Sequence, residues 1–105
     1  MAVAGVSVRD SRVANRVRFR AIVRGRVQGV SFRYYTLEMA RELEVLGFVR
    51  NRWDGTVEIV AEGKEASICR LVMWLHTGPR WARVEDVDVT WEEPVGEFKQ
   101  FEVRF

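Results

Sequence analysis

The chain has 105 residues, of which 48% are hydrophobic and 30% charged, with a formal net charge of +2. This length allows one domain, and the apolar and aromatic content excludes a disordered chain. One cysteine and one histidine exclude an internal disulfide and a Cys/His zinc site. No apolar run reaches the ~20 residues of a membrane helix, and residues 1–8 lack the basic start of a signal peptide. We therefore expect a soluble, cytoplasmic protein.

Positive charge is concentrated in the first third of the chain. Residues 1–33 contain eight arginines and one acid, Asp10, whereas the remainder contains nine basic and fourteen acidic residues. The two balances, +7 and −5, sum to the net charge of +2. A basic segment of this kind favours an anionic partner, either a nucleic acid or a small phosphorylated molecule. Arginines that cover a solvated strand face would give the same count, so both interpretations stay open.

The first half of the chain predicts a strand, a turn and a helix. Residues 1–16 show no period and are interpreted as a flexible leader, which makes 17–105 the folded domain. Apolar and arginine residues largely alternate over 17–24, as in a strand with one buried face. Ser31 is placed to cap a helix, whose apolar positions keep helical spacing until Gly47 is expected to end it.

The second half predicts a hairpin, a helix and two further strands. Strands over 48–53 and 56–62 flank Asp54-Gly55, a strong two-residue hairpin signal. A helix begins near Lys64 and ends at Gly78-Pro79, and strands follow around 87–91 and 101–105. The order β-α-β-β-α-β plus a short fifth strand predicts an α+β, ferredoxin-like split βαβ sandwich. Two helices would cover one face of a mainly antiparallel sheet, and the pattern does not place the fifth strand.

The turn between the first strand and the first helix carries the sequence GRVQGVSFR at residues 25–33. A glycine-bracketed turn that enters a helix presents several free backbone N–H groups to one point, and the helix dipole adds positive charge there. Arg33 lies in the first helical turn, where its guanidinium can contact two phosphate oxygens. The segment lacks the Gly-Lys-Ser/Thr of a Walker loop. Phosphate binding and a purely structural tight turn both remain possible on spacing alone.

A second segment, GFVRNRWDGTVE, occupies residues 47–58. Asn51 lies in its predicted strand, where asparagine is disfavoured. In a split βαβ fold this strand can bring Asn51 beside the loop that follows the first strand, where its amide could contact a water molecule. A polar residue on an edge strand near a hairpin is the alternative interpretation.

Together, these two segments resemble the two signatures of the acylphosphatase family. The similarity extends from about Val17 to the C-terminus, with further matches at 61–63, 78–79, 82–84 and 96–98. The resemblance implies a ferredoxin-like fold and hydrolysis of acyl phosphates to a carboxylate and inorganic phosphate. Ser31, at a position that is often glycine in the family, and Trp53 in the hairpin are the main departures.

The resemblance also implies the roles of individual residues. Arg33 matches the family's phosphate-binding arginine and Asn51 its water-positioning asparagine. The implied phosphate-binding loop consists of Arg26, Val27, Gln28, Gly29, Val30, Ser31 and Phe32. No metal ligand and no cofactor is implied, and the expected partner is a small-molecule acyl phosphate, bound by a monomer.

The chemistry of acyl phosphates explains why the sequence needs few functional groups. The departing carboxylate is a weak base that leaves without a proton, so no general acid is required. Phosphoryl transfer depends mainly on positioning and on neutralising the charge of the phosphoryl oxygens. One arginine, a ring of N–H groups and a positioned water are therefore sufficient.

Two other classes of function share this fold. A nucleic-acid-binding module would explain the basic first third, but residues 56–62 lack an aromatic RNP signature and contain two acids, so we expect no nucleic-acid partner. A catalytically silent phosphate-binding domain is the second alternative. A metal-free assay of acyl phosphate hydrolysis separates both from the enzyme.

Overall fold

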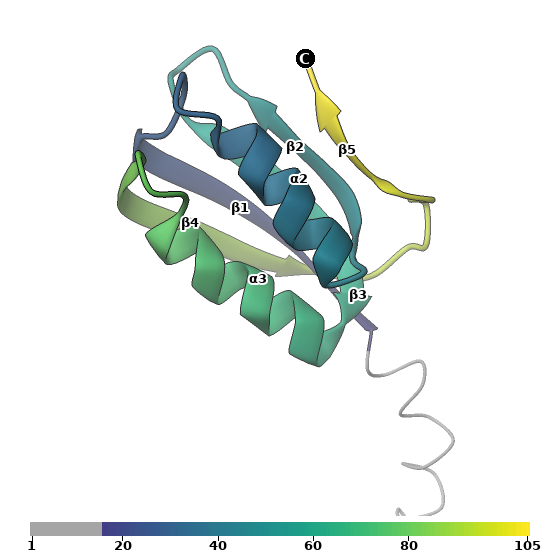
Figure 1. The fold of residues 1–105 in the computed structure, drawn as a ribbon. Helices are drawn as coiled ribbons and strands as arrows, with labels where there is room; N and C mark the ends of the chain where they lie inside the picture. The colour runs from purple at the N-terminus through teal and green to yellow at the C-terminus, as the bar shows by residue number, and fades with distance from the viewer. Residues whose placement is uncertain (1–15) are drawn as a thin grey trace, which may run out of the picture.

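A computed structural model of the protein describes residues 16–105. Two helices lie on one face of a five-stranded sheet (Figure 1). In chain order the elements are β1 (Arg16–Arg26), α2 (Phe32–Glu42), β2 (Leu46–Asn51), β3 (Val57–Lys64), α3 (Glu65–Thr77), β4 (Arg83–Glu92) and β5 (Phe101–Arg104). This order confirms the predicted ferredoxin-like arrangement. The predicted leader lies outside the described residues, apart from Arg16, with which β1 begins.

The sheet has the strand order β4-β1-β3-β2-β5. β1 pairs antiparallel with β3 and β4, and β2 pairs antiparallel with β3. β5, which the sequence pattern does not place, lies at the edge beside β2 and runs parallel to it. β1, β2 and β5 therefore all run in one direction, and their carboxyl termini lie at the same end of the sheet.

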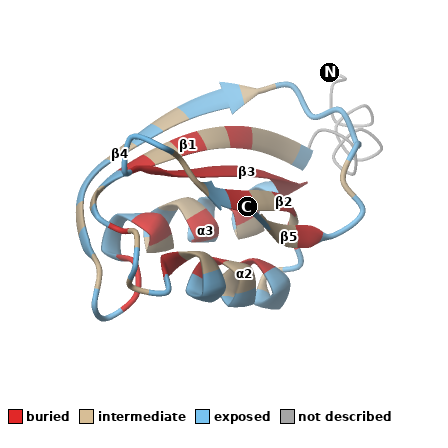
Figure 2. Ribbon diagram, turned by 90° about the horizontal axis from the view of Figure 1, so that it is seen from above, coloured by how far each residue is buried: buried red, intermediate tan, exposed pale blue. Residues whose placement is uncertain are grey.

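The hydrophobic core lies between the sheet and the helices (Figure 2). Every second residue of β1 and β3 points toward the helices, as a strand with one core-facing side requires. The fully buried side chains of this layer include Phe19, Ala21, Val23, Val57, Ile59, Ala61, Phe32, Ile68, Leu71 and Leu75. The alternation read from the sequence thus identifies the core-facing positions of both strands correctly.

The first helix ends earlier than the sequence predicts. α2 stops at Glu42, and Glu44 takes the left-handed conformation with a φ of 60°. Gly47 lies instead within β2, with a φ of 146°, and a Cβ atom there would meet the carbonyl oxygen of Val60 at 1.9 Å. The prediction that Gly47 ends the helix was therefore wrong, because this glycine permits the close approach of β2 to β3.

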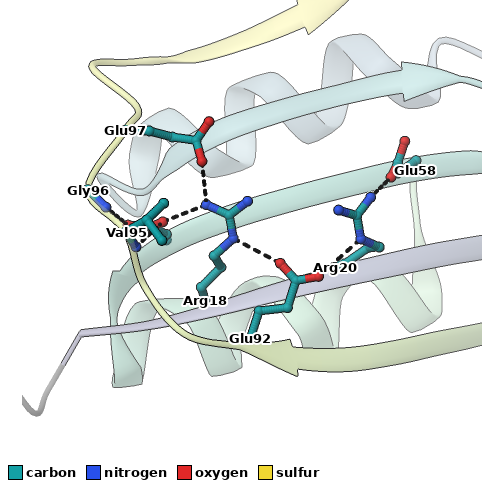
Figure 3. A network of polar contacts seen from close by, with 8 residues as sticks. Arg18, Arg20, Glu58, Glu92, Val95, Gly96 and Glu97 are labelled. Atoms are coloured by element: carbon teal, nitrogen blue, oxygen red, sulfur yellow. Dashed lines mark hydrogen bonds and ion pairs between the residues drawn. The ribbon is translucent and has the colours of Figure 1, made fainter.

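The sheet face opposite the helices is covered by ion pairs (Figure 3). Arg18 contacts Glu62 at 2.7 Å, Glu92 at 2.9 Å and Glu97 at 3.0 Å. These three carboxylates outweigh burial, which alone would lower the pKa of Arg18, and raise that pKa. Arg18 is thus tied to acids of β3, β4 and the connection that follows β4.

A second ion-paired group lies beside the first on the same face. Arg20 bonds both to Glu92, at 3.1 Å, and to the buried carboxylate of Glu58. Arg50 of β2 contacts Glu58 from the other side. Much of the positive charge that the sequence places on β1 is therefore paired with acids of neighbouring strands.

Glu62 also holds the 93–100 connection between β4 and β5 against the sheet. Its carboxylate accepts the backbone N–H of Val95 at 3.0 Å and that of Gly96 at 3.1 Å. Burial alone would raise the pKa of Glu62, but these two N–H groups and Arg18 outweigh it and hold the pKa below its usual range. Phe98 of the same connection packs edge-on against Phe48, with ring centroids 6.0 Å apart.

The depressed pKa of Glu62 predicts a specific pH dependence of stability. The ionised form stabilises the fold above the unfolded-state pKa of about 4.3, and this contribution is lost as pH falls through the lower, folded-state pKa. Glu62→Gln should lower the free energy of unfolding by about 1–3 kcal/mol at pH 7, because it disrupts buried charge-assisted hydrogen bonds. The difference between wild type and variant should shrink in urea melts below pH 4.

The exposed Glu42 at the end of α2 provides the matched control. Glu42→Gln should change stability by less than about 0.5 kcal/mol at either pH, as is usual for surface substitutions. A Glu62→Gln variant with wild-type stability at pH 7 would contradict this role of the carboxylate.

Candidate active site

A cleft of about 520 Å³ opens at the end of the sheet where β1, β2 and β5 terminate. The β1–α2 loop, the β2–β3 turn and the C-terminus all lie at this end of the molecule, at the top of Figure 1. The lining residues are Val27, Gly29, Ser31, Phe32, Arg33, Tyr34, Asn51, Val103 and Phe105. The cleft thus joins the two predicted signature segments, which the intervening α2 separates in sequence.

The loop before α2 has the geometry of an anion site. Its ends are fixed by the buried side chains of Val27 and Phe32, while Gly29 and Ser31 have positive φ angles of 75° and 62°. The first N–H groups of a helix have no intrahelical acceptor, and here no acidic side chain lies in the first turn to compete for them. Ser31 occupies the cap position, as predicted, but its side chain makes no capping hydrogen bond.

Arg33 extends from the first turn of α2 into the cleft. Its guanidinium carbon lies 4.8 Å from the ring centroid of Phe105, a cation–π contact. No carboxylate of residues 16–105 forms an ion pair with it, in contrast to Arg18 and Arg20. Its donors therefore remain available to an anion in the cleft.

Asn51 is the last residue of β2 and faces the cleft from the other side. Its Oδ1 atom is buried, yet it accepts no hydrogen bond from any group of residues 16–105. A buried carbonyl oxygen without a donor is costly and uncommon in folded proteins. This oxygen is thus an acceptor that a ligand or a water molecule in the cleft can use.

Three of the predicted loop residues do not line the cleft. Arg26 is exposed at the end of β1, opposite Arg83 of β4, and Val30 packs against the core. The side chain of Gln28 bonds to the turn that follows β2, with its nitrogen 2.7 Å from the carbonyl oxygen of Arg52. The predicted loop residues that do line the cleft are Val27, Gly29, Ser31 and Phe32.

The far wall of the cleft was missed by sequence reasoning. It consists of Val103 and Phe105, with Tyr34 beside them on α2. The alternation of residues 101–105 predicts a strand correctly, but it gives no information about which strand becomes its neighbour. The pairing of β5 with β2 is what brings these side chains to Arg33.

Other kinds of site receive little support within the described residues. Residues 16–105 contain no group of three His, Cys, Asp or Glu side chains arranged to hold a metal ion. His76 is exposed on α3, with its Nδ1 atom 3.0 Å from the carbonyl oxygen of Val72. No helix in this part of the chain is long and apolar enough to cross a membrane.

The chain is similar to proteins of one known family. The family model described as Acylphosphatase matches residues 19–103. The chain belongs to the acylphosphatase family. An acylphosphatase of Anaeromyxobacter dehalogenans is 50% identical over 93 residues, which cover 89% of this chain and 100% of that protein.

Solved acylphosphatase structures share the fold as well. The crystal structure of the Bacillus subtilis acylphosphatase matches with a TM-score of 0.82 at 37% identity, over 85% of this chain and 99% of that one. The Coxiella burnetii acylphosphatase matches with a TM-score of 0.82 at 38% identity, over 88% and 96% of the two chains. The predicted family, fold and activity are thereby confirmed, and the protein is a hydrolase of acyl phosphates.

The side-chain oxygen of Asn51 makes a prediction about stability. It accepts no hydrogen bond from residues 16–105, so Asn51→Ala removes no protein–protein hydrogen bond through this atom. The melting temperature of the ligand-free acylphosphatase should therefore change by no more than a few degrees, as is usual when no such contact is lost. Differential scanning calorimetry measures this directly. A loss of more than about 1 kcal/mol would show that Asn51 contributes to the fold through contacts of its side chain.

Proposed function

We propose that the cleft between Arg33 and Asn51 is where the protein hydrolyses acyl phosphates. One observation carries this assignment: a single cleft is bordered by Arg33, by the N–H groups at the start of α2 and by the side-chain oxygen of Asn51. Within residues 16–105, Arg33 has no ion-pair partner and the Asn51 oxygen has no hydrogen-bond donor. An anion-binding half and a water-binding half thus face one another. This is the arrangement that attack of water on a bound phosphoryl group requires.

The phosphoryl group binds to the loop and to Arg33. Backbone N–H groups between Gln28 and Arg33 surround its oxygens, and the guanidinium of Arg33 donates two parallel hydrogen bonds. As the bond to the acyl oxygen lengthens, charge develops on the equatorial oxygens, and these preorganised donors stabilise it. Phe105 holds the guanidinium from behind through its cation–π contact.

Water attacks from the side of Asn51. The Oδ1 atom accepts a hydrogen bond from the water. This contact directs a lone pair of the water oxygen toward phosphorus, opposite the acyl oxygen. The new P–O bond forms as the bond between phosphorus and the acyl oxygen breaks, and the carboxylate leaves with the bonding electrons. A phosphoryl oxygen takes up one proton of the water, so no separate general base is needed, and the carboxylate leaves without a proton, so no general acid is needed either. Arg33 and the N–H groups neutralise the phosphoryl charge in place of a metal ion.

We further propose that the protein acts as a monomer in the cytoplasm, without a nucleic-acid partner. A cleft formed from residues of one chain supports the monomer. Pairing of Arg18, Arg20 and Arg24 with acids supports the absence of a nucleic-acid site on β1. The single free cysteine, the exposed Cys69, is compatible with a reducing compartment.

Substitution of Arg33 tests the phosphate-binding half. Arg33→Ala should raise the inhibition constant of inorganic phosphate by about 10²-fold or more, because two charge-assisted hydrogen bonds are lost. Turnover should nearly disappear. Arg33→Lys should recover little, since an ammonium group cannot reproduce the bidentate geometry. Arg41→Ala on the same helix is the control, and phosphate binding by Arg33→Ala at wild-type strength would place the anion elsewhere.

Substitution of Asn51 tests the water-binding half. Asn51→Ala should lower kcat by about 10²–10³-fold, the effect of one lost positioning group. The inhibition constant of phosphate should change less than about 2-fold, since phosphate binds on the opposite side of the cleft. Simultaneous loss of turnover and phosphate binding would assign Asn51 to the anion site. Circular dichroism of the variant controls for misfolding.

The proposed reaction predicts full activity without a metal. Hydrolysis of benzoyl phosphate, followed by its ultraviolet absorbance, should proceed at the same rate before and after dialysis against excess chelator. Arg33, rather than a metal ion, neutralises the phosphoryl charge in this mechanism. A loss of turnover that Mg²⁺ or Zn²⁺ restores would overturn it.

A further inference from the structure

Gln28 links the two halves of the cleft through its side chain. Its amide nitrogen donates one hydrogen bond to the carbonyl oxygen of Arg52, at 2.7 Å, and another to that of Thr56, at 2.8 Å. Both donors of the amide are thus used. Arg52 directly follows Asn51, and Gln28 directly precedes Gly29 of the cleft wall.

The two acceptors belong to a rigid turn. Arg52 donates its N–H to the Thr56 carbonyl at 2.8 Å, and Gly55 donates its own to the Arg52 carbonyl at 3.2 Å. Asp54 accepts the N–H of Thr56 at 3.1 Å and its hydroxyl at 2.6 Å, and the hydroxyl bond foremost lowers the pKa of Asp54. Gln28 therefore attaches the loop to a turn that is ordered by its own hydrogen bonds.

No strand pairing performs the same task. β3 lies between β1 and β2, so the sheet hydrogen bonds connect the two signature segments only through a third strand. Within residues 16–105, the hydrogen bonds that join residues 27–31 directly to residues 51–56 are the two that Gln28 donates. Core packing fixes the two ends of the anion-binding loop, and this one amide supplies its direct hydrogen bonds to the turn that follows Asn51.

We propose that Gln28 is a positioning residue, which sets the place of the bound phosphoryl group relative to the water held by Asn51. This inference rests on the proposed function of the cleft. The side chain of Gln28 does not line the cleft, and both donors of its amide are used within the protein. Its loss lets the loop move relative to the turn, and a displacement of about 1 Å between reacting groups can cost about 10²-fold in rate.

The test is a double-mutant cycle on benzoyl phosphate hydrolysis. Gln28→Met keeps the shape of the side chain but removes both donors. We expect its kcat to fall by about 10–10²-fold, with less than about 3-fold change in the inhibition constant of phosphate. In the Asn51→Ala background, Gln28→Met should lower kcat less than about 2-fold further, since no positioned water remains to be misplaced.

Gln28→Ala provides a second variant, and Gln100→Ala, at an exposed glutamine outside the cleft, provides the matched control with wild-type kcat. Thermal melts accompany each assay. Additive losses in the double variant, or Gln28 variants with wild-type kcat, would overturn the positioning role while leaving the cleft assignment intact. Gln28 variants that both melt below the assay temperature would assign Gln28 to folding and overturn it as well. Unchanged kcat in Asn51→Ala alone would instead overturn the proposed function together with this inference.

Discussion

The central strand β3 buries two carboxylates, Glu58 and Glu62, and their need for counter-charges organises much of the molecule. A buried carboxylate is tolerated only when it is paired and hydrogen-bonded. Glu62 meets this condition with Arg18 and with two N–H groups of the 93–100 connection, which leads directly into β5. The same contacts therefore hold the strand that supplies Phe105 to the cleft. The contacts on the sheet face opposite the helices thus also help to position one wall of the proposed active site.

These ion pairs also explain the uneven distribution of charge along the sequence. Arg18, Arg20 and Arg24 of β1 pair with acids of β3 and β4, so part of the arginine excess in the first third is neutralised across the sheet by acids from the rest of the chain. Arg33, in the helix that follows β1, makes a different kind of contact. It contacts an aromatic ring and no carboxylate of residues 16–105, which suits the phosphate-binding role that we propose for it.

The sequence alone predicts the element order, the core-facing residues and the two residues proposed for catalysis. These features depend on local periodicity and on motifs that resemble those of the acylphosphatase family. The partner of β5, the close contact that requires Gly47 and the far wall at Phe105 depend on tertiary pairing, which periodicity does not encode. The role of Gln28 could not be predicted from the sequence for the same reason. Its place in the loop motif is readable, but its bonds to the turn after β2 appear only in three dimensions.

The most direct test of this account follows the oxygen atom of the attacking water. Benzoyl phosphate is hydrolysed by the enzyme in ¹⁸O-labelled water, and both products are analysed by mass spectrometry after correction for spontaneous hydrolysis. Water held by Asn51 and directed at a phosphoryl group in the loop attacks phosphorus, so we expect one ¹⁸O atom in the inorganic phosphate and none in the benzoate. Label in the benzoate would mean that water attacks the acyl carbon, and would contradict the assigned roles of Arg33 and Asn51.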